Sequence, residues 1–224
     1  GSEMCIRDSW NNPAGLEAEL VDLLSSFPVE KPLAITMTGE LADCYANKTE
    51  GVLHICTSVA RAASNRLHRV YASSGRWLET DEITGNQDLA RSVAAANWHA
   101  LARYAARFGA GQFQLLIDIG STTTDIIPIR DGEPPASGVT DTERLTRGEL
   151  VYAGVRRTPL SSLVSELPWR GKQVPVAREL FATTLDTYLL LGALPGNTED
   201  RGTADGEPAT VEHARARMAR MVCA

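Results

Sequence analysis

The chain has 224 residues and is 43% hydrophobic, which is enough to bury a sizeable core in one large or two small domains. Its 28 acidic and 22 basic side chains give a net charge of −6, so it lacks the basic surface expected of a nucleic-acid-binding protein. No apolar run approaches the length of about 18 residues that a membrane-spanning helix requires.

The N-terminal residues 1–9 show no periodicity, and we interpret them as a cloning or sequence-assembly artefact outside the fold. Residues 10–110 are expected to form a first α/β segment. Residues 111–224 are expected to form a second segment, with a phosphate-binding hairpin and a C-terminal helical region.

In the first segment, apolar spacing predicts three helices and three strands. The helices are expected at 16–27, 49–66 and 86–108, with Thr49 as the N-cap of the second. The strands are expected at 33–37, 67–72 and 75–78, with a hairpin turn at Ser73-Ser74 between the last two.

In the second segment, two apolar β-type runs flank a turn within 115–129, whereas 133–147 is too polar to be core. Strands are expected at 151–155 and 173–177, and 180–191 is open between helix, strand and cap. A helix is expected at 208–222, with three arginines on a solvated face: Arg215, Arg217 and Arg220. This alternation of strands and helices predicts an α/β layered domain.

The turn at Gly120 to Thr123 is the strongest candidate site. Two strands folding back on each other would leave its backbone N–H groups in one concavity, which favours an anion such as phosphate. Ser121, Thr122 and Thr123 add hydroxyl donors, and Asp118 is placed to hold Mg²⁺ beside the phosphate. The alternative is an ordinary hairpin turn, because Gly, Ser and Thr are common turn residues.

Other carboxylates and arginines are weaker candidates. Glu40 and Asp43 follow a strand end and are candidates for a general base or a second metal-directed carboxylate, with helix-start stabilisation as the alternative for Glu40. Asp186 is a further candidate carboxylate, with helix capping as its alternative. Arg144 and Arg147 could clamp a phosphate, although solvated surface arginines are the default interpretation.

The four cysteines, Cys5, Cys44, Cys56 and Cys223, form no Cys-x-x-Cys pair, so we expect reduced thiols in a cytoplasmic protein. The four histidines are dispersed in the sequence and none has metal-ligand spacing with another. The sequence therefore predicts no zinc site.

The string from Asp118 to Ile126 resembles the second phosphate motif of the superfamily of actin, heat-shock ATPases and sugar kinases. Together with three other segments, it resembles the hydantoinase/oxoprolinase branch, and within that branch the proteins of tetrahydromethanopterin-linked one-carbon metabolism. The three segments are 36–43, 148–154 followed by Thr158-Pro159, and 179–186.

The resemblance implies an actin-like ATPase (ribonuclease H-like) α/β fold, expected to be incomplete at both ends because the first phosphate motif and the adenosine-binding segment are not matched. It implies a phosphorylated or diphosphorylated small-molecule substrate, Mg²⁺ as cofactor, and substrate contacts from Thr38, Gly39, Thr184 and Asp186. A homo-oligomer is left open.

The activity implied by the resemblance is a synthase of methanofuran-type cofactor biosynthesis. Such an enzyme would condense an aminomethylfuran diphosphate with a phenolic, glutamyl-tyramine-like substrate and release diphosphate. Two alternatives remain open at this stage: an ATP-dependent amidohydrolase or small-molecule kinase, and an inactive lobe of a longer protein.

Overall fold

The computed structural model describes residues 12–109, 111–134 and 140–224, so the interpretation of 1–9 as an artefact lies outside the described residues. The chain forms two compact units that are not consecutive in sequence. The first contains the described residues up to Leu116 together with Ile127–Arg147, and the second contains Ile117–Ile126 and Gly148–Ala224. Each unit combines helices with small sheets, which agrees with the α/β class at that coarse level.

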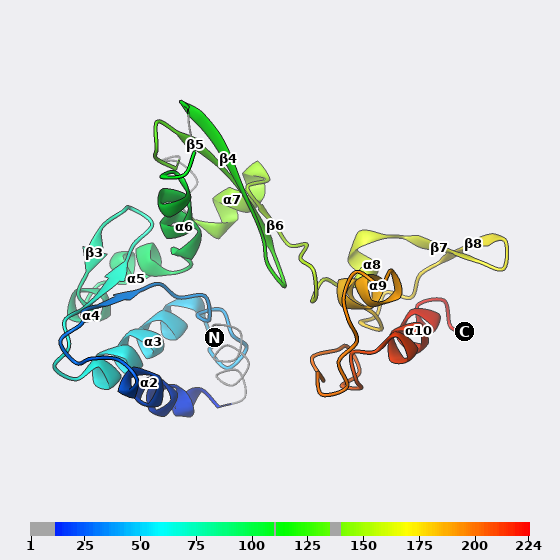
Figure 1. The fold of residues 1–224 in the computed structure, drawn as a ribbon, viewed down its shortest axis with the longest axis horizontal. Coiled ribbons are helices and arrows are strands. Elements are labelled where there is room, and N and C mark those ends of the chain that lie inside the picture. Colours follow the sequence, from blue (N-terminus) through cyan, green and yellow to red (C-terminus); the bar gives the residue numbers. More distant parts are fainter. Residues whose placement is uncertain (1–11, 110, 135–139) are drawn as a thin grey trace. The chain divides into compact units, whose positions relative to one another are not determined.

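The first unit is built around a three-stranded sheet in the order β1-β2-β3, of which β3 is labelled in Figure 1. Strands β1 (Leu33–Ile35) and β2 (His68–Tyr71) are parallel and are joined by helix α3 (Lys48–Ala63), as parallel neighbours require a crossover. Strand β3 (Trp77–Leu78) pairs antiparallel with β2, which confirms the predicted hairpin.

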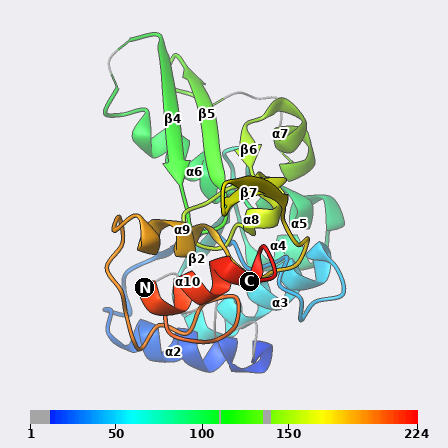
Figure 2. The same cartoon turned by 90° about the vertical axis from the view of Figure 1, so that its right-hand side faces the viewer.

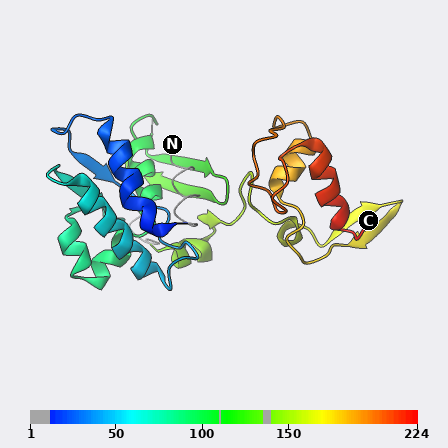
Figure 3. The same ribbon diagram turned by 90° about the horizontal axis from the view of Figure 1, so that it is seen from below.

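Helices complete the first unit. A short 3₁₀ turn η1 (Pro13–Gly15) leads into α2 (Leu16–Ser25), which lies beside α3 in Figure 3. Helices α4 (Thr80–Thr84) and α5 (Gln87–Val93) follow β3 and also contact α3. Their apolar faces and the sheet enclose one core: Met37, Val52, Cys56, Val70, Ala72, Leu78, Ile83, Ala90, Val93 and Ala94.

The single helix predicted at 86–108 is wrong, because the chain forms α5 and a separate helix α6 (Asn97–Ala105). Between them, Ala95 has a positive φ of 50°, which a continuous helix cannot contain. The amide and hydroxyl groups of Ser73 both donate to the Ser92 carbonyl, at 2.8 and 3.1 Å. A contact from the β2–β3 turn therefore occupies a carbonyl near the end of α5, despite the helical propensity of the alanine run.

Strands β4 (Phe113–Ile119) and β5 (Thr124–Arg130) form the long predicted hairpin, shown side by side in Figure 2. In the first unit, Leu116 of β4 and the buried Ile127 and Ile129 of β5 pack against Trp98 and Ala102 of α6. Helix α7 (Asp141–Arg147) follows, so the prediction that 133–147 lies wholly outside the core is wrong for Arg144, which is 1% exposed.

In the second unit, the short strand β6 (Leu150–Val151) pairs with β5 and covers only the start of the strand predicted at 151–155. Helix α8 (Leu160–Leu163) precedes the antiparallel pair β7 (Glu166–Trp169) and β8 (Lys172–Pro175). Helices α9 (Thr184–Leu190) and α10 (Val211–Arg220) contact each other, and their buried Leu185, Leu189 and Ala214 form one core with Ala209 of the loop before α10.

Candidate functional site

The turn between β4 and β5 keeps most of the predicted donors available. The amide of Gly120 donates to the Thr123 carbonyl at 2.8 Å, so the expectation that Gly120 offers its N–H to a phosphate is corrected. No acceptor within the described residues is assigned to the amides of Ser121, Thr122 and Thr123. The nest is therefore formed by three consecutive residues rather than four, and all three side chains are half-buried.

The turn is supported from within its own unit by the segment 154–157. The Gly120 carbonyl accepts from the Val155 amide at 3.0 Å, and the Ser121 carbonyl accepts from the amides of Arg156 and Arg157 at 3.0 and 2.9 Å. These three hydrogen bonds connect the turn to the segment 154–157.

Gly154 makes this close approach feasible. A Cβ at Gly154 would lie 2.6 Å from the Gly120 carbonyl oxygen and from two backbone atoms of the turn, which cannot yield as a flexible side chain can. We expect Gly154→Ala to destabilise the protein by about 1–3 kcal/mol and to weaken phosphate binding. Gly196→Ala is the matched control, because its Cβ would meet only ordinary contacts at 3.6 Å or more. Thermal unfolding and phosphate titration of both variants test this prediction. Equal losses of stability and of phosphate affinity in the two variants would contradict a role for the close contact at Gly154.

Asp118 lies near the end of β4, two residues before the turn. It alternates with exposed neighbours, so its half-buried side chain shares a strand face with Leu116. No hydrogen bond or ion pair to its carboxylate is found among the described residues. The carboxylate is thus neither capped nor neutralised within the part of the chain that the structure describes.

Asp125 is a residue that the sequence analysis did not single out. It shares a face of β5 with the buried Ile127 and Ile129, and it lies opposite Leu150 of β6. Because Leu116 of β4 packs against Ile127 and Ile129, alternation places Asp118 and Asp125 on the same face of the hairpin. The signal that could have found Asp125 is its even spacing from these two isoleucines.

The residues at the turn fit a Mg²⁺–phosphate group. Mg²⁺ uses one or two carboxylates and completes its shell with water and phosphate oxygens, while the free amides supply donors for the phosphate. In the described part of the chain, no group of three or more His, Cys, Asp or Glu side chains could hold a metal by itself. A metal here would therefore depend on phosphate oxygens for part of its shell.

The second predicted carboxylate of this unit has a structural role. Asp186 accepts from the Thr183 amide at 2.9 Å as part of a capping box, and its other oxygen accepts from Arg217 Nε at 2.7 Å. It is 1% exposed. The helix-capping alternative is confirmed, and the expectation that Asp186 contacts substrate is corrected because both oxygens are already bonded.

Thr184 is likewise bonded inside the second unit. Its hydroxyl donates to the Gly154 carbonyl at 2.7 Å, and its amide donates to the Thr158 carbonyl. Thr184 therefore holds the segment that supports the turn. The predicted donation of its hydroxyl proton to a substrate is corrected, because that proton is already bonded to Gly154.

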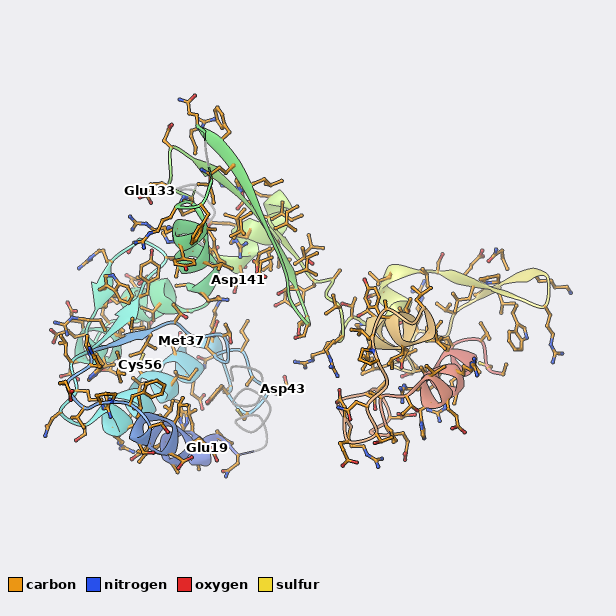
Figure 4. The ribbon with its side chains drawn as sticks, viewed as in Figure 1. Glu19, Met37, Asp43, Cys56, Glu133 and Asp141 are labelled. Carbon is orange, nitrogen blue, oxygen red and sulfur yellow. The ribbon has the colours of Figure 1, made fainter. Side chains whose placement is uncertain are left out.

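In the first unit, the residues predicted after β1 separate into exposed and buried positions. Thr38 and Asp43 are exposed, Gly39 is half-buried, and Glu40 is 1% exposed. Figure 4 marks Asp43 together with Asp141, another residue of the same unit. Substrate contacts from Thr38 and Gly39, and a catalytic role for Asp43, stay predictions.

Glu40 is held against the first turn of α3. A Cβ on Gly51 would lie 2.2 Å from the Glu40 carbonyl oxygen, so only glycine permits this approach. Glu40 Oε1 lies 3.9 Å from Lys48 Nζ, whereas its buried Oε2 has no hydrogen-bond partner within the described residues. Glu40 precedes α3 by several residues and does not cap it. The N-cap of α3 is Asn47, whose side chain accepts from the Glu50 amide at 3.0 Å. The prediction of Thr49 as the N-cap is therefore wrong.

Burial raises the pKa of Glu40 above its usual value of 4.5, and Asp141 acts in the same direction. The backbone amides of Glu40 and Ala95 and the Lys48 ammonium lower the pKa, but they do not outweigh burial. Glu40 is therefore a stronger base than an exposed glutamate, although its burial limits direct access.

Glu40→Gln is expected to stabilise the protein at pH 8. A raised pKa in the folded state means that the contribution of the carboxyl to stability is fully present below pH 4.5 and is lost as the pH rises through the folded pKa. Each unit of that shift corresponds to about 1.4 kcal/mol. Thermal unfolding should show that the variant is more stable than the wild type at pH 8 and about equally stable at pH 4. A gain of equal size at both would contradict the buried-carboxyl explanation.

The two predicted phosphate-clamping arginines differ in exposure. Arg144 is 1% exposed, and its guanidinium carbon lies 4.2 Å from the centre of the Trp98 ring. Both the surface interpretation and a substrate clamp are therefore corrected for Arg144, because cation–π packing buries it. Arg147 is exposed, in agreement with the solvated alternative.

The start of α7 is a further feature that was not predicted from the sequence. Thr140 and Glu143 bond reciprocally, the Thr140 amide donating to Glu143 at 3.1 Å and the Glu143 amide donating to the Thr140 hydroxyl at 3.3 Å. This is a capping box, and its Thr-x-x-Glu pattern was readable in the sequence. Asp141, which the box places at the start of α7, meets Lys48 as described below.

The described residues also limit other kinds of site. A shallow hollow of about 560 Å³ is lined by α3 residues including Thr49, Leu53 and His54, and by none of the predicted site residues. None of the described helices is long and apolar enough to cross a bilayer.

Comparisons with known proteins identify the family of this chain and two relatives. Residues 33–224 match the protein family described as Hydantoinase/oxoprolinase. The chain is 39% identical over 207 residues to the (4-{4-[2-(gamma-L-glutamylamino)ethyl]phenoxymethyl}furan-2-yl)methanamine synthase of Methanocaldococcus jannaschii, covering 92% of this chain and 61% of the relative. It is 42% identical over 109 residues to the protein of the same name from Methanococcus vannielii, covering 49% of each. The chain thus spans less than two thirds of the length of either relative.

Proposed function

Because the chain belongs to the hydantoinase/oxoprolinase family, we propose that it acts in a synthase that joins a phenol to an aminomethylfuran diphosphate and releases diphosphate. The name of the relatives from Methanocaldococcus jannaschii and Methanococcus vannielii describes a phenoxymethylfuran, which contains the aryl ether that this reaction would form. The observation that carries the proposal is the turn with three unbonded amide positions next to an unneutralised Asp118.

The reaction balances as a nucleophilic substitution. The phenol oxygen forms a bond to the methylene carbon, the bond from that carbon to the diphosphate oxygen breaks, and the phenolic proton passes to a base. The amides of Ser121, Thr122 and Thr123 would orient the diphosphate and stabilise its growing charge. Mg²⁺, held through Asp118, would supply further neutralisation of the leaving oxygen.

We assign the base role to Glu40, with Asp43 as the exposed alternative. Glu40 has a raised pKa and an oxygen without a partner in the described structure, both of which suit proton acceptance. A substrate hydroxyl would have to approach beside Lys48 and Asp141, the partly exposed members of its surroundings. Glu40 and the hairpin turn belong to different compact units, so each role is proposed from its own unit.

We also propose that the two units belong to an actin-like ATPase fold, in which the β4–β5 turn would be a phosphate motif. The parallel β1-α3-β2 unit and the β-hairpin support this assignment. The family description itself favours a second candidate function, ATP-dependent opening of a cyclic amide, since the same anion-binding turn could serve ATP.

The deciding experiment incubates the purified protein and Mg²⁺ with three sets of substrates, followed by assays for phosphate, diphosphate and organic product. The sets are furan diphosphate with a glutamyl-tyramine-like phenol, ATP with a hydantoin, and ATP alone. We expect diphosphate and aryl ether in equal amounts from the first set. Phosphate from ATP that depends on the hydantoin would favour the amidohydrolase, and no turnover in any set would support the inactive-lobe alternative.

A further inference from the structure

Lys48 lies between two carboxylates at the start of α3. Its Nζ is 2.6 Å from Asp141 Oδ2 and 3.9 Å from Glu40 Oε1. The Lys48 side chain is 32% exposed and that of Asp141 20%, whereas Glu40 is almost fully buried. The ammonium therefore hydrogen-bonds to Asp141 and makes only a longer charge contact with Glu40.

The main chain of Glu40 packs closely against the first turn of α3. Its carbonyl lies where a Cβ of Gly51 would be, so its main chain is in direct contact with the same helical turn that carries Lys48. Asp141 approaches from α7, a different element. The Lys48 ammonium therefore has carboxylates from two different elements near it, and it lies closer to that of Asp141.

We propose that Lys48 and Asp141 are positioning residues for Glu40: Asp141 draws the ammonium to itself and keeps it beyond hydrogen-bond distance, which leaves the buried carboxyl free to exchange a proton. This rests on the base role in the proposed function. Neither residue is required to touch substrate, and no other part of the described site supplies a cation to Glu40.

The arrangement predicts opposite effects for the two partners. The charged groups acting on Glu40 among the described residues are Lys48 from α3 and Asp141 from α7. Removing the ammonium leaves burial and Asp141, both of which favour the protonated carboxyl. Removing the Asp141 charge releases the ammonium to bond to Glu40, which favours the ionised carboxyl.

The test uses Lys48→Met and Asp141→Asn, each alone and combined with Glu40→Gln, with thermal unfolding measured from pH 4 to pH 9. The measured quantity is the stability gained at pH 8 when Glu40→Gln is added to a given background. This gain should be larger in the Lys48→Met background than in the wild type, and smaller in the Asp141→Asn background. Lys31→Met, at an exposed lysine, is the control for loss of a positive charge and should leave the difference unchanged. Lys48→Arg keeps the charge and should behave closer to the wild type than Lys48→Met.

Shifts in the same direction for both variants, or shifts equal to that of Lys31→Met, would overturn the proposal. If a variant does not fold at neutral pH, its stability can be followed from pH 4, where Glu40 is protonated, up to the highest pH at which it stays folded, and Lys48→Gln offers a second uncharged side chain. The inference is overturned if, over that range, the stability difference between the variant and its Glu40→Gln partner changes with pH in the same way as in the wild type.

Measuring ether formation as a function of pH distinguishes a failure of this inference from a failure of the proposed function. If the protein forms the ether, the acidic limb of its kcat/KM profile should move by roughly one pH unit or more, upward for Lys48→Met and downward for Asp141→Asn. Opposite stability shifts without any ether formation in the wild type would support the positioning of Glu40 and reject the synthase. Ether formation with an unmoved acidic limb in both variants would overturn the positioning role and retain the synthase.

Discussion

Arg217→Ala is expected to lower the free energy of unfolding by about 3–5 kcal/mol, the cost of breaking a buried ion pair by removing one partner. The Arg217 side chain is 0% exposed, and its Nε donates to Asp186 at 2.7 Å while another nitrogen donates to Asp205 at 2.9 Å. Without the guanidinium, Asp186 would remain as an uncompensated charge between α9 and α10. Denaturant unfolding measures the loss.

Arg215→Ala is the matched control, because Arg215 lies on the exposed side of the same helix. Its removal should change the unfolding free energy by less than about 0.5 kcal/mol. Equal losses for the two variants would mean that helix propensity or net charge, rather than the buried pair, determines the effect.

The same network should make the protein sensitive to acid. Burial raises the pKa of Asp205, but hydrogen bonds from Arg220 and Arg217 outweigh it and lower the pKa from 3.8 to about 2. The contribution of Asp205 to stability is therefore present above pH 3.8 and is lost as the pH falls towards 2. Because Asp205 is partly exposed, the effect is reduced by solvent. Asp205→Asn should flatten the unfolding profile below pH 4, and an unchanged acid limb would contradict this role.

Asp118→Asn is expected to reduce turnover by about a hundred- to a thousandfold while the thermal stability changes little. The reason is that the proposed function uses this carboxylate, which no described group bonds or neutralises, to hold Mg²⁺ beside the leaving diphosphate. Initial rates at several Mg²⁺ concentrations, with unfolding curves measured in parallel, would test this.

Asp22→Asn, at an exposed position on α2, controls for the loss of one negative charge. Undiminished turnover of the Asp118 variant, with the same dependence on Mg²⁺ as the wild type, would remove the metal role. A lost activity accompanied by unfolding would instead assign Asp118 to the stability of the hairpin.

The sequence determined those features that depend on neighbouring residues. The apolar runs around Gly120 to Thr123 specify a hairpin, because alternation and turn chemistry are local properties, and the β2–β3 hairpin and the helices at 16–25 and 211–220 follow from similar patterns. The family was also readable from four short motifs taken together. The capping alternative for Asp186 was available as well, since Thr183 precedes it by three residues.

Tertiary structure alone decided which polar groups are buried and which are free. Helical spacing placed Arg217 on a solvated face, yet Asp186 from α9 and Asp205 from the preceding loop neutralise it in the interior. The break at Ala95 and the glycines beneath Glu40 and Gly120 likewise depend on segments distant in the sequence. Periodicity reports the average polarity of a face, whereas the cost of burying a charge depends on partners that only folding brings within hydrogen-bond distance.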